Sequence, residues 1–225
     1  MTRFPLSESD RALVTDAVTT AEAGTDGEIV TIVTRRSDDY RDTGLVWAAM
    51  AMLLVVALAA AMPWAIDAKV ALVTGGWEAP SGALRLVALL LIEALVFGLA
   101  LLAFRNARLR LALTPPRVRA RRVRGRAIRY FKVGAEKRTT ARVGVLLYLS
   151  LDERLAEIVA DEAIHAKVPP ERWGDAMVAL VDEVRAGRPA HGMAAAVGRI
   201  GAIVAEHFPK TEDDRNELPD RLIEL

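Results

Sequence analysis

The chain of 225 residues contains no cysteine, only three histidines, and few aromatic residues. Without cysteine it can form neither disulfides nor thiolate-ligated metal sites, and its composition leaves the compartment open. A glycine-rich phosphate-binding loop and an Asp-x-Asp pair are also missing. The sequence therefore lacks the most direct motifs of nucleotide binding and phosphoryl transfer.

Charge is almost absent from two long stretches. Gly44–Ile66 has no charged residue, and Leu86–Phe104 has only Glu93. Each stretch can cross a hydrocarbon layer about 30 Å thick at about 1.5 Å per helical residue. A buried core helix needs neither this length nor apolar residues on every face. We therefore expect a transmembrane hairpin over residues 43–105, with a short polar loop between its two spans.

The net charge of +1 hides a strong asymmetry. Residues 105–138 hold thirteen Lys and Arg against one acid, Glu136, so the rest of the chain is acidic. The loop between the spans has only Lys69 and Arg85 as cations. The positive-inside rule then places both termini in the cytoplasm. The polar, acid-rich residues 1–42 are unlike a secretory signal. We expect a protein of the cell (inner) membrane with two spans.

A basic amphipathic helix is expected over residues 106–138, connecting the hairpin to the C-terminal part of the chain. Arginine next to a span attracts anionic lipid headgroups, at about 1 kcal/mol per cation. An Arg-rich helix can also bind nucleic acid, but here only Tyr130 and Phe131 supply aromatic rings. Lipid is thus the expected partner, and nucleic acid is not. The candidate lipid contacts are Arg117, Arg121, Arg122 and Arg124.

Glu93 lies inside the second span, where an acid costs about 2.5–3.5 kcal/mol on insertion scales. It is expected to face another helix or to be protonated. One interpretation is a polar contact with another membrane protein, or with a second copy of the chain, through the hairpin. The other is that Glu93 sits shallow enough to be tolerated.

The first soluble part, residues 1–42, has a helical pattern that ends at Gly24. The β-branched run 28–34 then predicts a strand. The second soluble part, residues 139–209, contains a continuous apolar run at 143–149 that is typical of a central buried strand.

After this run, residues 155–160 predict an antiparallel strand and two helices follow. The acidic tail, residues 210–225, is expected to wrap the surface or extend from it. Neither soluble part can bury its own strands alone. We therefore expect one three-layer α/β/α sandwich with a small mixed sheet, interrupted by the two-helix hairpin.

If the first two strands are parallel, both begin at one end of the sheet, which we call the distal pole, and the third strand ends there. Carboxylates favour Mg²⁺ or Ca²⁺, and an imidazole shifts the preference toward transition metals. A divalent ion is therefore one expectation; the alternative is that Asp161 caps a helix and His165 is a surface residue. The candidate metal ligands are Asp161, Glu162, His165 and Glu28, and the candidate ligand-binding residues are Glu22, Thr25 and Arg142.

No catalytic residue can be named from the sequence. Asp152 suits a nucleophilic carboxylate by position, because it follows the second strand. It also lies in an expected hairpin turn, where aspartate is common.

Several segments resemble the TPM domain family. Arg142–Leu151 is similar to the signature strand of that family, and Asp161–His165 is similar to its G-D-x-G-I-H segment, with Trp173 following. The segment 207–219 is similar to the closing motif of a bacterial branch. The opening helix and strand, with Glu22, Thr25 and the strand from Glu28, also resemble the family.

The resemblance covers both soluble parts in order and implies an α/β/α sandwich. Ala160 and Ala163 stand where relatives have glycine, and the hairpin lies inside the domain rather than at one end. Most relatives expose the domain outside the cytoplasm, whereas the charges here place it inside. Relatives include proteins described as phosphatases, as metal-binding and as assembly factors. The first hypothesis is a membrane-anchored interaction or assembly module for a membrane complex; the alternative is a metal-dependent phosphatase-like hydrolase.

Overall fold

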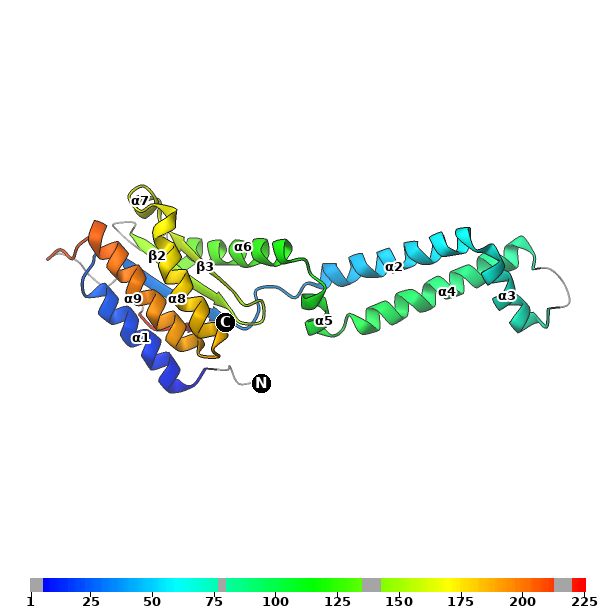
Figure 1. Cartoon of the computed structure of the whole chain (residues 1–225), viewed down its shortest axis with the longest axis horizontal. Coiled ribbons are helices and arrows are strands. Elements are labelled where there is room, and N and C mark those ends of the chain that lie inside the picture. Colours follow the sequence, from blue (N-terminus) through cyan, green and yellow to red (C-terminus); the bar gives the residue numbers. More distant parts are fainter. Residues whose placement is uncertain (1–5, 77–79, 135–142, 213–219) are drawn as a thin grey trace. The chain divides into compact units, whose positions relative to one another are not determined.

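The computed structural model describes residues 6–76, 80–134, 143–212 and 220–225. The chain forms two compact units, one made of Met1–Asp38 with Arg117–Leu225 and the other of Asp39–Pro116. We describe each unit by itself (Figure 1). The first unit, which we call the α/β unit, combines two stretches that the second unit, the hairpin unit, separates in the sequence.

The α/β unit contains a four-stranded mixed sheet in the order β3-β2-β1-β4. Strands β1 (Glu28–Thr34) and β2 (Gly144–Ser150) are parallel, with Ile29 opposite Val145. Strand β3 (Leu155–Ala160) runs antiparallel to β2. Every residue of β1 and β2 is buried. The expected pairing between the two soluble parts is confirmed.

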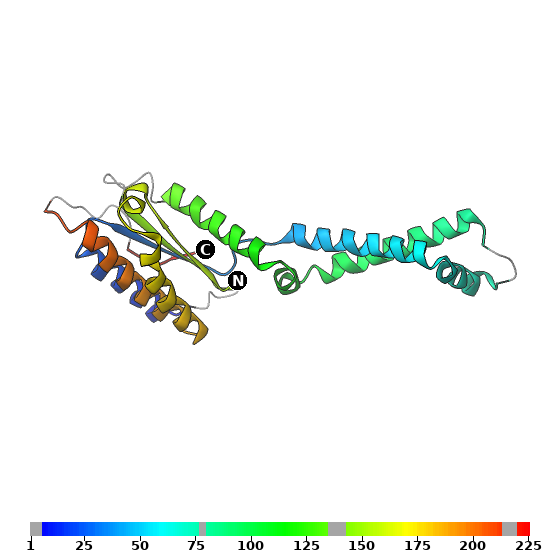
Figure 2. The same cartoon turned by 45° about the horizontal axis from the view of Figure 1, so that its top comes forward.

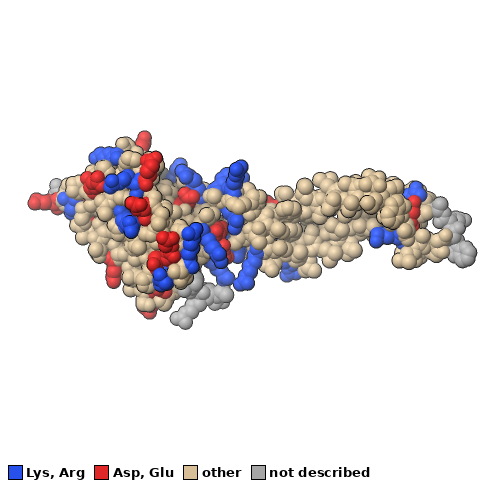
Figure 3. All heavy atoms as spheres, in the orientation of Figure 1, with Lys and Arg blue, Asp and Glu red and all other residues tan. Residues whose placement is uncertain are grey.

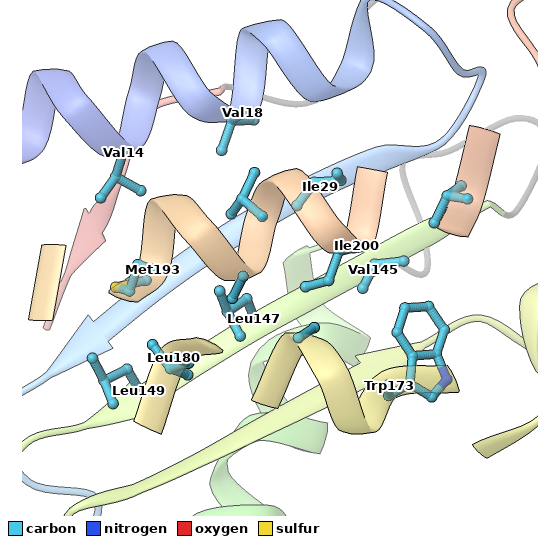
Figure 4. Close-up of a cluster of buried hydrophobic side chains, with 14 of the residues drawn as sticks. Val14, Val18, Ile29, Val145, Leu147, Leu149, Trp173, Leu180, Met193 and Ile200 are labelled. Atoms are coloured by element: carbon cyan, nitrogen blue, oxygen red, sulfur yellow. The ribbon is translucent and has the colours of Figure 1, made fainter. Parts of the chain in front are cut away.

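Three helices, α1 (Glu8–Glu22), α8 (Gly174–Arg185) and α9 (Pro189–His207), cover one face of the sheet. Two short helices, α7 (Glu162–His165) and η1 (Pro170–Trp173), precede α8. Figure 4 shows apolar side chains from the long helices pointing toward those of the strands. The labelled residues of this core are Val14, Val18, Ile29, Val145, Leu147, Leu149, Trp173, Leu180, Met193 and Ile200.

The basic helix α6 (Pro116–Gly134) covers the opposite face of the sheet (Figure 2). Val123, Ala127 and Phe131 follow one another at a spacing of four, so they lie on one side of the helix. All three are buried against the side chains of β1 and β2 that point away from the first core, among them Tyr148. The three-layer α/β/α arrangement predicted from the sequence is confirmed.

The end of the acidic tail departs from the prediction. Ile223–Glu224 form a short strand, β4, which pairs in parallel with β1 and places Ile32 opposite Ile223. Leu222 is buried next to it. A two-residue strand has no periodicity that a sequence pattern could reveal, which explains why the tail was expected to lie outside the fold. The strand covers part of the otherwise open edge of β1.

The hairpin unit contains α2 (Arg41–Ala61) and α4 (Gly82–Ala103), both long and apolar enough to cross a membrane. Their most apolar windows have mean hydropathies of 2.4 and 2.7, yet only 11% and 6% of these windows are buried. A core helix of a soluble protein would instead be covered on most sides. A short helix, α5 (Ala107–Ala112), follows α4.

The link between the two long helices also differs from the prediction. The expected first span, Gly44–Ile66, breaks before Pro63, and residues Pro63–Thr74 form a separate helix, α3. Proline lacks an N–H and is favoured at the start of a helix, so α3 begins at it. Asp67 of α3 accepts two hydrogen bonds from Arg85 of α4, at 2.6 and 3.1 Å. The expected polar loop is therefore largely helical within the described residues.

Candidate functional site

Polar side chains gather around a pocket of about 230 Å³ at the distal pole, where β1 begins. Of the residues predicted to bind a ligand there, Glu22 and Thr25 line the pocket together with Glu28. Arg142 lies outside the described residues. The pocket, which we call the Glu22 pocket, is lined by Thr19, Glu22, Ala23, Thr25, Gly27, Glu28, Lys210 and Asp220.

The turn between α1 and β1 shapes one wall of this pocket. The Thr25 hydroxyl donates to the carbonyl of Phe208 at 2.5 Å and accepts from the Gly27 N–H at 3.0 Å. A Cβ atom on Gly27 would lie only 2.4 Å from Cγ1 of Val204. Glycine is therefore required at this position, and the turn is held against α9 and the segment after it.

Glu22 is a buried acid in the wall of the pocket. Its carboxyl accepts a hydrogen bond from the Ile29 N–H at 2.6 Å. Burial raises the pKa of Glu22 to about 8; the Ile29 N–H opposes this increase, the charges of Glu28 and Asp220 add to it, and Lys210 opposes it. At neutral pH the carboxyl is mostly protonated and can donate a hydrogen bond into the pocket.

Three polar residues of the pocket were not predicted from the sequence: Thr19, Lys210 and Asp220. The Thr19 hydroxyl donates to Asp220 at 2.7 Å, and the Lys210 ammonium donates to the carbonyl of Glu22 at 3.3 Å. Thr19 lies on the exposed side of α1. Lys210 and Asp220 lie in the segment after α9, and a segment without regular hydrophobic periodicity gives no prediction of its position. The pocket thus offers hydroxyl, ammonium and carboxyl groups to a small polar group of a ligand or partner.

The predicted metal ligands are placed differently. Asp161 is buried, and its carboxylate accepts from the Gly144 N–H at 2.8 Å, which joins the end of β3 to the start of β2. It occupies the cap position of α7 but does not cap that helix with its side chain. Glu162 and His165 are exposed. Among the described residues, no group of three or more His, Asp and Glu is placed to hold a metal ion. Binding of a divalent ion by these residues and Glu28 stays a prediction. The positions of Asp161, Glu162 and His165 do not support it.

The four predicted lipid contacts lie on α6, over which Figure 3 shows Lys and Arg side chains. Arg117 and Arg121 are exposed. Arg122 lies 3.1 Å from the carboxylate of Asp38, and Arg124 lies 3.9 Å from that of Glu157. Two of the four arginines therefore also pair with acids of the α/β unit itself.

A buried polar network, which the sequence did not reveal, lies at the other end of β1 and β2. The carboxylate of Glu153 accepts from the N–H of Ser37 at 2.8 Å and from the hydroxyl of Ser150. The Ser37 hydroxyl lies 2.9 Å from that of Tyr148. Burial raises the pKa of the Tyr148 phenol, so this phenol stays neutral. We call these four residues the Glu153 network.

Ion pairs extend this arrangement to the last residues before the hairpin. Arg36 lies 2.7 Å from the carboxylate of Asp152, and Arg126 of α6 donates to the carbonyl of Ser37 at 3.1 Å. The segment 35–38 is thus fixed to both the sheet and α6. Asp152, the positional candidate for a nucleophile, pairs with arginine here, which is a structural contact. The sequence did not reveal the contacts of Asp152 with Arg36 and of Glu153 with Ser37, because these partners are over a hundred residues away.

No protein-family model matches this chain, and no curated protein does either. Among solved structures, the chain is similar to the NMR structure of the BA42 protein from the psychrophilic bacterium Bizionia argentinensis. The TM-score is 0.57 at 15% sequence identity, and the match covers 100% of this chain and 99% of that chain. At such an identity the likeness concerns the fold alone.

Proposed function

We propose that this chain is a two-span membrane protein whose α/β unit is a TPM-like interaction or assembly module for a membrane complex. The observation that carries the proposal is the exposure of α2 and α4, whose most apolar windows are only 11% and 6% buried. Exposed apolar surface of this extent marks a membrane or protein contact. A length of about 20 apolar residues favours the membrane.

The way the hairpin interrupts the α/β unit supports an anchored module. Strand β1 precedes the hairpin and β2 follows it, so the sheet forms only when both sides of the hairpin come together. Asp38, which pairs with Arg122, stands three residues before α2 begins. The unit is therefore joined to its anchor by two chain segments, and the first is held by the Glu153 network and its ion pairs.

The Glu22 pocket is the proposed point of contact with a ligand or partner. It lies at the opposite end of the sheet from residues 35–38, and it combines a protonated carboxyl with an ammonium and hydroxyl groups. The phosphatase-like hydrolase is the alternative, and no observation on the described residues favours it.

The lack of cysteine makes membrane insertion and orientation simple to test. A Val73→Cys variant of α3 should react with a membrane-impermeant maleimide on intact cells. A Glu162→Cys variant of α7 should react only after the cells are permeabilised, because the positive-inside rule places the α/β unit in the cytoplasm. Release of the unmodified chain by alkaline carbonate would disprove the anchor, and the reverse labelling pattern would disprove the orientation.

The interaction role is tested in solubilised membranes by native electrophoresis. The full chain should migrate in a complex larger than the chain alone. A Glu28→Gln/Lys210→Gln variant of the Glu22 pocket should lose this complex, whereas an Arg172→Gln/Glu206→Gln variant, which removes an exposed ion pair between η1 and α9, should retain it. Equal migration of the two variants would refute the role of the pocket.

A further inference from the structure

A groove of about 480 Å³ lies within the hairpin unit, between the start of α2 and the end of α4. It combines three cationic residues with apolar ones in one place. We call it the hairpin-base groove. It is lined by Arg41, Gly44, Leu45, Leu101, Phe104, Arg105 and Arg110.

A glycine allows the two long helices to approach closely at this groove. A Cβ atom on Gly44 would lie 2.9 Å from Cβ and 3.1 Å from Cγ of Phe104, so a larger residue would push the two helices apart. On either side, Leu45 is 55% exposed and Leu101 is 42% exposed. The apolar walls of the groove therefore continue directly into the exposed apolar surfaces of α2 and α4.

One of the three arginines is held in place by backbone groups. Arg110 donates through Nη1 to the carbonyl of Phe104 at 2.5 Å and through Nε to the carbonyl of Asp39 at 2.8 Å. These bonds satisfy a carbonyl at the end of α4, which has no partner within its own helix. Arg110 thus adds a fixed positive charge to the groove.

The other two arginines have little to neutralise them. Arg41 lies 3.4 Å from the carboxylate of Asp39, and both side chains are mostly exposed, so this pair is weak. Arg105 is exposed and pairs with no acid among the described residues. Three cations thus line a groove whose lining contains no acid among the described residues.

We propose that the hairpin-base groove binds one anionic phospholipid, with the phosphate on Arg41 and Arg105 and an acyl chain along Leu45 and Leu101. Guanidinium groups bind phosphate through paired, charge-assisted hydrogen bonds. Because the walls are apolar, we expect the groove to bind a phosphate group attached to a hydrocarbon chain more tightly than a free phosphate. This inference rests on the proposed membrane anchor and deepens it, because it names a defined site rather than a general attraction to basic residues.

The site is tested with the full chain in a non-ionic detergent, by native mass spectrometry with phosphatidylglycerol and with phosphatidylcholine of the same acyl chains. The wild type should retain phosphatidylglycerol in preference. An Arg41→Gln/Arg105→Gln variant should bind it at least about tenfold more weakly, because it loses charge-assisted hydrogen bonds.

The matched control is Arg108→Gln/Arg129→Gln, which removes the same number of charges from exposed positions that do not line the groove. It should bind phosphatidylglycerol as the wild type does. An equal loss in the two double variants would show diffuse attraction and overturn the site, as would unchanged binding in the groove variant. If the groove variant does not fold, Arg105→Gln alone serves as the test, since Arg105 has no ion pair to lose among the described residues.

Two further measurements separate the possible failures. Glycerol 3-phosphate at the same concentration should not displace the lipid, and displacement would overturn the need for an acyl chain. Alkaline carbonate should leave the wild type in the membrane. A chain that is extracted overturns the proposed anchor, whereas a chain that stays but shows no difference between the double variants overturns only the groove.

Discussion

Glu22 places a carboxyl with a pKa of about 8 beside Glu28, Asp220 and Lys210, in a pocket that also contains two threonine hydroxyls. Burial is the main cause, so the charged form is the one that the folded chain disfavours. Between pH 4.5, the ordinary value, and about pH 8, the unfolded chain has lost this proton while the folded chain keeps it. The free energy of unfolding therefore falls as the pH rises through this range.

Replacing Glu22 with Gln should remove this pH dependence. The amide oxygen can still accept the Ile29 N–H, and no charge forms at high pH. The variant should be more stable than the wild type at pH 8 by about 1–2 kcal/mol, with little difference at pH 5; screening by water in the pocket reduces the effect. Pulse proteolysis of the full chain in urea at both pH values measures it. The exposed Glu162→Gln should show no such difference, and equal pH profiles for both variants would contradict the assignment.

Asp161 should contribute to stability through its hydrogen bond to the Gly144 N–H. Asp161→Ala leaves a buried N–H without its partner and should lower the free energy of unfolding by about 1–3 kcal/mol. Asp161→Asn keeps an acceptor oxygen and should recover most of the loss. Hydrogen exchange at the start of β2 in the full chain measures both. A loss in the exposed neighbour Glu162→Ala as large as that in Asp161→Ala would speak against this role.

Among the elements, α4 is notable for a buried acid inside an apolar span. Glu93 is 8% exposed, and neither of its carboxyl oxygens has a hydrogen-bond partner among the described residues. The carboxyl is enclosed within the hairpin unit. The sequence allowed a contact between Glu93 and another protein chain. Such a contact would require the Glu93 side chain to turn from the inside of the hairpin unit to its surface.

Glu93→Leu should therefore favour insertion of α4. An apolar residue removes the cost of an acid inside a span, about 2.5–3.5 kcal/mol on insertion scales, and Glu93→Gln should have a smaller effect. A glycosylation-based insertion assay on α4 measures the change. Cross-linking of the full chain should show the same oligomeric state in all three proteins. Loss of an oligomer only in Glu93→Leu would show that the acid contacts another chain after all.

The secondary-structure elements also differ in how well they could be predicted from the sequence. Strands β1 and β2 were predicted because continuous β-branched and apolar runs are typical of a doubly covered sheet. Strand β4 was missed, since two residues show no pattern and pairing with Val33 and Ile32 decides its conformation. Helix α3 was also missed, because an apolar run that continues across Pro63 resembles a single span.

At the scale of the whole molecule, the α/β unit is built from both sides of the hairpin. The core on the α9 side contains Val14 and Val18 from before the hairpin and Leu180 and Met193 from after it. Neither side has enough apolar surface of its own to cover the sheet. Folding of the unit and assembly of the hairpin are therefore coupled.

A chain divided in the link between α3 and α4 should still assemble. Residues 1–76 and 80–225, expressed together, should co-purify from the membrane, because the parallel pairing of β1 with β2 and the packing of α2 on α4 join them. Either fragment expressed alone should be degraded, since each lacks a central strand and core side chains that the other supplies. Co-purification measured with a tag on one fragment tests this. Stable accumulation of either fragment alone would contradict the shared core.

The sequence by itself determined the hairpin, the basic helix and the α/β/α layers, because each depends on local hydrophobic periodicity and charge. It also identified Glu22, Thr25 and Glu28 as neighbours, since parallel strands begin at the same end of a sheet. Only the tertiary structure decided that Lys210 and Asp220 complete the Glu22 pocket, that Asp161 binds the Gly144 N–H, and that Arg41 and Arg105 line one groove. These contacts join residues far apart in the chain, and side-chain packing, which has no local pattern, selects them.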